Sequence, residues 1–197
     1  MKKIVVGITG ASGSIYSKRL IEELLEKGIY VHIICTENGE KVMKYETSLD
    51  IKQWISELKT KYDHIKLEDI NDLFSGVASG SYKFDAMIIL PCSMGTLAEI
   101  SNGLSRNLLC RVADVALKEN RKLIICPRET PLNAIHLENM LKLSKLGVTI
   151  LPPMPGFYHK PKTLEDLVNF VVGKILDYLS IENTLFEKWD DKKNVKY

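Results

Sequence analysis

Residues 3–14, KIVVGITGASGS, join a short apolar run to a cluster of small residues. The apolar run is typical of a buried strand, and residues 14–27 show helical spacing that stops at Gly28, a residue suited to the left-handed end of a helix. Small residues between the two elements permit a tight turn. The stretch therefore predicts a strand, a turn and a helix in succession, which is the opening unit of an α/β sheet.

Four further apolar segments have the character of strands, at 29–35, 86–91, 122–126 and 148–151, with amphipathic stretches between them. The run MIIL at 87–90 lacks polar alternation, which indicates a strand covered on both faces. We therefore predict an α/β fold that is doubly wound and Rossmann-like, with a parallel sheet of five or six strands and helices on both faces. Residues 64–67 are the candidate for the sixth strand.

Further helices are predicted at 106–120, 136–146 and 163–181, the last with Thr163 as its N-cap. Residues 45–58 fit either one helix or two. We expect a single domain over residues 1–181 and a polar C-terminal extension over residues 182–197. Leu185, Phe186 and Trp189 suit this extension to docking on a neighbouring subunit.

The composition excludes several classes of function. With 197 residues, 45% apolar content and a net charge of +2, the chain is an ordinary globular protein that gives nucleic acid no strongly basic surface. Its apolar runs are far shorter than the roughly 20 residues of a membrane span, and the N-terminus begins a strand, so we expect a cytoplasmic protein. The four cysteines form no CxxC pair and the four histidines are scattered, which predicts no metal site.

Three turns follow predicted strands and should meet at the carboxyl edge of the sheet, where open α/β sheets bind ligands. In GITGASG at 7–13, backbone N–H groups at a helix N-terminus can face an anion, which makes this segment a candidate nucleotide turn. It lacks the full GxGxxG spacing, and a tight turn needs small residues for steric reasons alone. The other turns are residues 36–39 and 91–96. A helix cap is the simpler explanation of Ser93 and Thr96 when each is taken singly.

Two cations, Arg111 and Lys118, stand two helical turns apart in the helix predicted at 106–120. This spacing places both on one face, where together they can hold a phosphate. Asp114 and Glu119 are close enough to make the same face an ordinary solvated surface instead. Sequence alone leaves both interpretations open.

Further candidate side chains follow the last two predicted strands. Arg128 and Glu129 come directly after the strand at 122–126, where an arginine can hold a phosphate and the adjacent carboxylate can move a proton. The segment PPMPGFY at 152–158 forms a loop that its prolines stiffen, and it presents Tyr158 to the same edge or to an adjacent subunit. A loop that only covers the core is the plain alternative.

Five segments together resemble the flavin prenyltransferase family of the UbiX type. They are GITGASG at 7–13, PCSMGTLAEI at 91–100, RNLLCRVADVALKENR at 106–121, PRETPLNAIHLENMLKLSKLG at 127–147 and PPMPGFYHKP at 152–161. The resemblance runs from about residue 3 to residue 189. It implies transfer of a dimethylallyl group from dimethylallyl phosphate to reduced FMN, which builds a fourth ring across N5 and C6 and yields prenylated FMN. It also implies a homo-oligomer, either a trimer or a dodecamer of trimers, and a UbiD-type decarboxylase that receives the product.

The resemblance also implies roles for residues at matching positions. The implied FMN contacts are Gly10, Ala11, Ser12, Thr36, Ser93, Met94, Gly95, Thr96 and Arg128. The positions around the prenyl phosphate are Glu46, Arg111, Lys118, Arg128, Glu129, Tyr158 and Lys174, where family members often have arginine in place of Lys174. Catalytic roles fall to Ser12, Glu46, Lys118, Glu129 and Tyr158, with Ser12 near the flavin N5 and Glu129 transferring a proton as phosphate departs. No metal ion is implied, because the cations neutralise a monophosphate.

Two other functions fit the same residues. An FMN-dependent decarboxylase of the cysteine-decarboxylating type would share the fold and the flavin site but would leave Arg128 and Glu129 without an obvious role. A non-catalytic FMN carrier subunit would bind the flavin and deliver it unaltered. Turnover of reduced FMN with dimethylallyl phosphate would distinguish a prenyltransferase from both the decarboxylase and the carrier.

Overall fold

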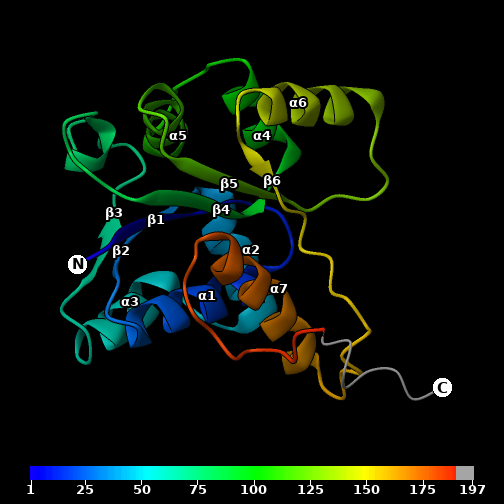
Figure 1. The fold of residues 1–197 in the computed structure, drawn as a ribbon. Helices are drawn as coiled ribbons and strands as arrows, with labels where there is room; N and C mark the ends of the chain where they lie inside the picture. Colours follow the sequence, from blue (N-terminus) through cyan, green and yellow to red (C-terminus); the bar gives the residue numbers. More distant parts are fainter. Residues whose placement is uncertain (190–197) are drawn as a thin grey trace. The chain divides into compact units, whose positions relative to one another are not determined.

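The structure, a computed structural model that describes residues 1–189, is built on a parallel sheet of six strands in the order β3-β2-β1-β4-β5-β6 (Figure 1). The strands are β1 (Lys3–Ile8), β2 (Tyr30–Cys35), β3 (Ile65–Glu68), β4 (Ala86–Cys92), β5 (Lys122–Pro127) and β6 (Thr149–Ile150). This order confirms the predicted doubly wound fold. The sixth strand is β3, which residues 64–67 suggested.

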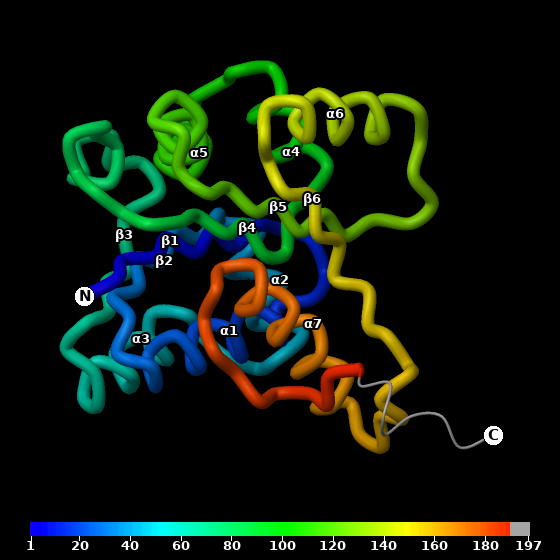
Figure 2. The backbone as a smooth tube through the Cα atoms, in the orientation of Figure 1, coloured from blue at the N-terminus to red at the C-terminus, as the bar shows by residue number. Residues whose placement is uncertain are grey.

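Helices cover both faces of the sheet in the part of the chain that the structure describes. They are α1 (Ser14–Glu26), α2 (Glu37–Thr47), α3 (Ile51–Lys59), α4 (Met94–Ser101), α5 (Leu108–Lys118), α6 (Ala134–Lys145) and α7 (Leu164–Tyr178), together with a short 3-10 helix, Gly76–Ala78. In Figure 2, α1, α2 and α3 lie on one face of the sheet and α4, α5 and α6 on the other. Because both faces are covered, β4 is buried along its whole length, as its unbroken apolar run predicts.

The helix ends follow the local chemistry of the sequence. Gly28 and Gly147 follow α1 and α6 with positive φ angles of 67° and 85°, which confirms both predicted stops. Thr163 caps α7 by accepting a hydrogen bond from the backbone N–H of Asp166 at 3.1 Å. Residues 45–58 contain the end of one helix and most of another, because Asp50 caps α3 and separates it from α2.

The chain divides into two compact units, Met1–Pro152 and Pro153–Tyr197. The first contains the whole sheet with α1 to α6, and the second contains α7. This division does not coincide with the predicted boundary after residue 181, which stays a prediction. Residues 190–197 of the predicted C-terminal extension lie outside the described residues. Every helix within residues 1–189 is too short or too polar to span a membrane.

Gly39, in the first turn of α2, allows the helix to approach β1 closely. A Cβ atom at this position would lie 2.8 Å from the carbonyl oxygen of Ile8 and 2.9 Å from the sulfur of Cys35. We expect Gly39→Ala to lower the free energy of unfolding by about 1–3 kcal/mol, because backbone and a buried thiol must both shift. Urea unfolding measures the change. Gly95→Ala is the control, since nothing lies within 4 Å of a Cβ there; an equal loss in both variants would contradict the steric explanation.

Candidate active site

The order of the sheet reverses between β1 and β4, and ligands of doubly wound folds bind at the carboxyl ends of such a strand pair. Thr9, the buried residue after β1, joins the two strand ends. Its hydroxyl donates to the carbonyl oxygen of Pro91 at 2.9 Å and accepts from the backbone N–H of Ser93 at 2.8 Å. The turns after β1 and β4 therefore start from one fixed junction.

The turn after β1 packs closely against α2, and this packing leaves room only for small side chains in the turn. A Cβ atom at Gly10 would lie 2.6 Å from the Cβ atom of Asn38, so glycine is required there. Gly13 has a φ of 115° and is the N-cap of α1, a conformation that favours glycine. Ala11 is buried, whereas Ser12 is exposed. Close packing thus explains the glycines, and Ser12 is accessible to a ligand.

The N-terminus of α1 holds an anion that the chain itself supplies. The carboxylate of Glu46 accepts hydrogen bonds from the backbone N–H groups of Gly13 at 3.0 Å and Ser14 at 2.9 Å. Partial burial disfavours the charged form, but hydrogen bonds from the Ser12 side chain and from the N–H groups of Ser14 and Gly13 outweigh it and lower the pKa of Glu46. The N–H groups predicted to face a ligand phosphate are therefore occupied by an ionised carboxylate.

In the two other predicted turns, Thr36 and Ser93 are the N-cap residues of α2 and α4. The Thr36 hydroxyl accepts from the N–H of Gly39 at 3.1 Å and opens α2, which starts earlier than the sequence indicated. The Ser93 hydroxyl accepts from the N–H of Thr96 at 3.3 Å and donates to the Thr96 hydroxyl at 3.1 Å. Around Gly95 the first turn of α4 is open, since no atom lies within 4 Å of a Cβ position. The positive end of α4 can thus receive an anion.

Arg128 reaches from the end of β5 to the turn after β1. Its backbone N–H donates to the carbonyl oxygen of Cys92 at 3.1 Å, and its Nε donates to the carbonyl oxygen of Ser12 at 3.2 Å. A half-buried guanidinium therefore lies beside the Ser12–Glu46 pair. The structure brings these three predicted residues together from three separate segments.

Glu129 follows Arg128 in the chain and is exposed. Its carboxylate accepts a hydrogen bond from the backbone N–H of Thr130 at 2.9 Å. This local contact leaves the side chain open to solvent. Its predicted role in proton transfer stays a prediction.

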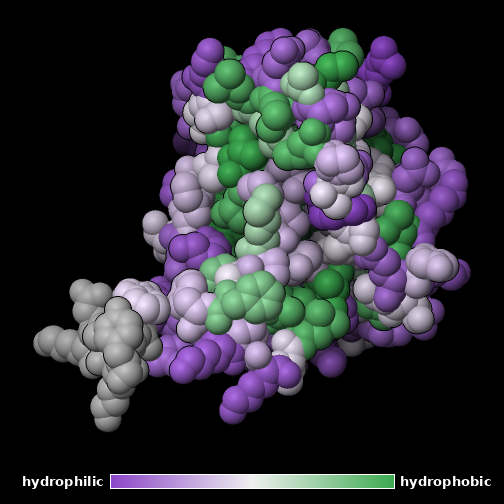
Figure 3. All heavy atoms as spheres, turned by 90° about the vertical axis from the view of Figure 1, so that its right-hand side faces the viewer, coloured by the Kyte–Doolittle hydropathy of each residue, from purple (hydrophilic) through white to green (hydrophobic). Residues whose placement is uncertain are grey.

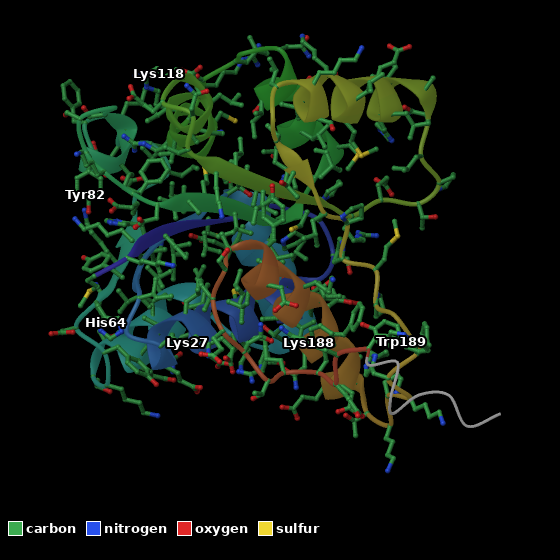
Figure 4. The ribbon with its side chains drawn as sticks, viewed as in Figure 1. Lys27, His64, Tyr82, Lys118, Lys188 and Trp189 are labelled. Carbon is green, nitrogen blue, oxygen red and sulfur yellow. The ribbon has the colours of Figure 1, made fainter. Side chains whose placement is uncertain are left out.

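Arg111 and Lys118 lie on α5 and pair with the acidic neighbours that the sequence suggested. Arg111 donates to Asp114 at 2.8 Å and to the carbonyl oxygen of Ala78 at 3.2 Å. Lys118 forms an ion pair with Glu119. Lys118 ends α5 shortly before β5 begins, and Figure 4 shows it on the side of Tyr82, beside the amino ends of the strands. Within one chain, Lys118 is therefore not brought to the carboxyl edge that holds Ser12.

The second unit carries Tyr158 and Lys174. Tyr158 packs edge-on against Phe170 and Trp189, with ring centroids 5.6 and 5.9 Å apart, and it is 44% exposed. These three aromatic side chains therefore form a cluster within the second unit. Lys174 is exposed on α7.

A cavity of about 700 Å³ opens beside Thr36, at the carboxyl ends of β2 and β3. Its lining contains more acidic than basic side chains: Glu37, Glu40, Glu68 and Asp69 against Lys52. This excess of negative charge disfavours a phosphate group. The carboxyl ends of β1 and β4, with Arg128 and the open first turn of α4, fit a phosphorylated ligand better.

Two residues of the site were not identified from the sequence, Thr9 and Asn38. A hydroxyl residue where an apolar strand meets a glycine turn was the available signal for Thr9. Asn38 gave no signal, because its contact with Gly10 exists only after α2 packs on the turn.

Comparison with known proteins defines the class first. Residues 1–176 match the family model described as Flavoprotein. The small residues around Gly10, the guanidinium of Arg128 and the open turn at Gly95 fit the anionic, planar ligand that this class binds.

Individual relatives narrow the assignment. The chain is 55% identical to the flavin prenyltransferase UbiX of Halalkalibacterium halodurans over 193 residues, which cover 96% of this chain and 94% of that relative. The crystal structure of AnUbiX (PadA1) in complex with FMN and dimethylallyl pyrophosphate is 39% identical, with a TM-score of 0.89 and coverage of 96% of this chain and 97% of that one. A dodecameric FMN-dependent Ubix-like decarboxylase from Escherichia coli O157:H7 is also 39% identical, with a TM-score of 0.88 and coverage of 95% and 99%. The chain belongs to the flavin prenyltransferase UbiX family of flavoproteins.

The hydrogen bonds to Glu46 predict a pH-dependent contribution to stability. Since the pKa of Glu46 is lowered in the folded protein, this contribution is present above the ordinary carboxyl pKa of 4.5 and is lost as the pH falls through the folded value. We expect Glu46→Gln to be less stable than the native chain at neutral pH, with a difference that shrinks as the pH falls below 4.5. Thermal unfolding across this range measures it.

Glu26→Gln serves as the control, because Glu26 is an exposed carboxylate at the end of α1. This variant should follow the native chain at every pH. If Glu46→Gln were destabilised equally at pH values above and below 4.5, the charged interaction would not be the cause.

Proposed function

We propose that this chain is a flavin prenyltransferase that joins the dimethylallyl group of dimethylallyl phosphate to reduced FMN. The observation that carries the proposal is the junction of Ser12, Glu46 and Arg128 at the carboxyl ends of β1 and β4. It combines a hydroxyl, an ionised carboxylate and a guanidinium in a place where doubly wound folds bind phosphorylated cofactors. Bound reduced FMN supplies the nucleophilic N5 and C6 atoms that receive the prenyl group.

The first task of the chain is to bind and orient the flavin. Ser93 to Thr96 present the positive end of α4, and Arg128 supplies a fixed cation beside Ser12. Gly10 and Ala11 keep side chains out of the same edge. Ser12 and Glu46 are the pair proposed to act beside the flavin N5, where the ionised carboxylate of Glu46 accepts a hydrogen bond from the Ser12 side chain and so orients it.

The second task is to stabilise the departing phosphate. Breaking the allylic C–O bond leaves negative charge on the phosphate oxygens, and preorganised cations lower the energy of that charge. Arg111, Lys118, Arg128 and Lys174 are the cations proposed for this purpose, with Glu129 as the group that transfers a proton to the leaving phosphate. Tyr158 provides an aromatic face for the allylic carbon as positive charge develops there.

A site shared between subunits would allow Lys118 on α5 to act together with Ser12, although the two residues lie at opposite ends of the strands within one chain. Lys118 lies at the amino end of β5 in its own chain, whereas Ser12 lies at the carboxyl end of β1. We therefore place Lys118 and Arg111 of one chain against the Ser12 junction of another, within the homo-oligomer that the sequence predicts. The dodecameric relative from Escherichia coli supports assembly of this kind.

The product, prenylated FMN, passes in this proposal to a UbiD-type decarboxylase. A cysteine decarboxylase is not favoured, because a relative more than half identical over nearly the whole chain is a flavin prenyltransferase. A carrier subunit would not need the Ser12–Glu46 pair. The cytoplasmic location expected from the sequence stays a prediction.

Glu129→Gln tests the proposed proton transfer. We expect FMN binding, followed by flavin fluorescence, to stay unchanged while the rate of prenylated FMN formation falls by about 10²- to 10⁴-fold. Mass spectrometry of the flavin after incubation with both substrates measures the product. Glu57→Gln, a change of another exposed carboxylate, is the matched control. Undiminished turnover in Glu129→Gln would remove this residue from the mechanism, and CO₂ release from a peptidyl cysteine would favour the decarboxylase.

Mixed oligomers test whether the site is shared. Ser12→Ala and Lys118→Ala chains, each inactive alone, are co-expressed with different affinity tags and purified through both. If one chain supplies Ser12 and another Lys118, random mixing leaves about a quarter of the sites complete, and activity returns to about that fraction of the native value. A site contained in one chain predicts no recovery.

A further inference from the structure

A polar network in the first unit, mostly buried, has no part in the proposed function. We call it the His32–Glu68 network, defined as His32, Glu68, Ser75 and Tyr82. His32 on β2 and Glu68 at the end of β3 are both buried, and Nδ1 of His32 lies 2.8 Å from Oε1 of Glu68. The hydroxyl of Ser75 donates to Oε2 of Glu68 at 2.9 Å, and Nε2 of His32 lies 2.9 Å from the hydroxyl of Tyr82. One buried pair therefore reaches two residues of the connection between β3 and β4.

The chemistry of the network sets the direction of its hydrogen bonds. Burial disfavours the charged form of Glu68, but hydrogen bonds from its neighbours, that from His32 first, outweigh this effect and lower the pKa of Glu68 to about 2. An ionised carboxylate only accepts, so Nδ1 of His32 donates to it. In the neutral imidazole ring, Nε2 then accepts from the hydroxyl of Tyr82. Both ring nitrogens and both carboxylate oxygens thus have partners, the condition under which a buried network makes a fold rigid.

The segment between the two outer members of the network borders two cations of α5. We call residues 75–82 the 75–82 segment. The carbonyl oxygen of Ala78 in this segment accepts a hydrogen bond from Nε of Arg111 at 3.2 Å. A Cβ atom at Gly80 would lie 2.6 Å from Nζ of Lys118, so the backbone of Gly80 packs directly against this ammonium group. The proposed function assigns the same two cations to the prenyl phosphate.

A third cation fastens the segment to the end of α5. Arg121, which follows α5, donates to the carbonyl oxygens of Tyr82 at 2.8 Å and Gly80 at 2.6 Å. Ala78, in the middle of the segment, is buried in the core cluster that includes residues of α5. The network therefore holds both ends of the segment, at Ser75 and Tyr82, while α5 packs along its middle. Releasing either end gives freedom to the backbone that borders the two cations.

Tyr82 and Lys118 lie away from the Ser12 junction of the same chain. Figure 4 shows both residues on the left, beside the amino ends of the strands. Figure 3 faces the opposite side, toward which β4 and β5 run in Figure 1 and where hydrophobic residues lie among hydrophilic ones. Ser12 follows the carboxyl end of β1. A change in the network therefore reaches the chemistry through α5 rather than through the turn that carries Ser12.

We propose that the His32–Glu68 network consists of positioning residues, which hold the 75–82 segment against α5 so that Arg111 and Lys118 keep the geometry that binds the prenyl phosphate. The inference rests on the proposed function, which gives these two cations that role. Preorganised charge stabilises a departing anion without the cost of ordering the charged groups first. Loss of the network should therefore weaken the use of dimethylallyl phosphate and leave the binding of FMN unchanged.

Tyr82→Phe and Ser75→Ala each release one end of the segment while the backbone carbonyl groups stay. We expect each variant to lower kcat/KM for dimethylallyl phosphate by about 2- to 10-fold, the effect of one net hydrogen bond, and the double variant to lower it further. The Kd for FMN, followed by flavin fluorescence, should stay native. Tyr62→Phe is the matched control, because Tyr62 also packs edge-on against a histidine, His64, but lies outside the segment. Its kcat/KM should equal the native value.

A double-mutant cycle with Arg111→Ala tests whether the network acts through α5. Arg111→Ala should itself lower kcat/KM for dimethylallyl phosphate, and Tyr82→Phe should then have a smaller effect than in the native background, because one group that it positions is gone. Equal effects in the two backgrounds would overturn the positioning role, and so would a native kcat/KM in the double variant of Ser75 and Tyr82. If the native chain forms no prenylated FMN, or if Arg111→Ala leaves kcat/KM unchanged, the phosphate role in the proposed function fails and this inference fails with it.

Gly80→Ala is an independent probe, because it displaces Lys118 and leaves the network intact. The added methyl group meets the flexible end of the lysine side chain rather than backbone, so urea unfolding and FMN binding should stay close to native. We expect kcat/KM for dimethylallyl phosphate to fall by about 10-fold or more, because a small displacement of a group that contacts the substrate is costly. An unchanged kcat/KM would contradict the claim that the 75–82 segment sets the working position of Lys118.

Discussion

The hydroxyl of Thr9 joins the ends of β1 and β4, the two strands between which the strand order of the sheet reverses. By donating to the carbonyl of Pro91 and accepting from the N–H of Ser93, it fixes the end of β1 against the end of β4. The turn that carries Ser12 and the helix that begins after Ser93 both start from this buried contact, so their relative positions are set before any ligand arrives. Arg128 joins the same junction through Cys92 and Ser12. A preorganised site follows, because three segments share one rigid origin.

The charged residues of the proposed site fall into two separate groups within one chain. Glu46 neutralises the N-terminus of α1, so we propose that a phosphorylated flavin uses the open end of α4 and the guanidinium of Arg128 instead. On α5, Arg111 and Lys118 are balanced by Asp114 and Glu119, and Lys118 lies near the amino end of β5. In the shared site that we propose, assembly of several chains brings the two groups of charges together, so that activity would depend on oligomerisation.

Much of the fold could be predicted because it depends on local patterns. Largely apolar runs identified β1, β2, β4, β5 and β6, and glycines with positive φ angles ended α1 and α6 where expected. The region after β2 was harder to interpret, since Thr36 suits a turn and a helix cap equally, and the start of α2 at Glu37 depends on its packing against β1.

The site was predictable in its residue types but not in its contacts. Sequence placed Ser12 and Arg128 at strand ends, where the structure finds them joined. It could not show that Glu46 closes the α1 N-terminus, because the two groups are about thirty residues apart and meet through tertiary packing. Nor could helical spacing alone decide whether Arg111 and Lys118 face the flavin edge of their own chain, since that depends on the direction in which α5 runs beside the sheet.

The contact between Gly10 and Asn38 has a consequence for how sequences of this kind can diverge. The conflicting atom at position 38 is a Cβ, which every amino acid except glycine possesses. Exchanging Asn38 for any other side chain therefore gives position 10 no additional freedom. Only glycine at 38 would open the space, and the backbone would then lose an ordering side chain in the first turn of α2. Position 38 can therefore vary among amino acids that have a Cβ atom, whereas position 10 must stay glycine.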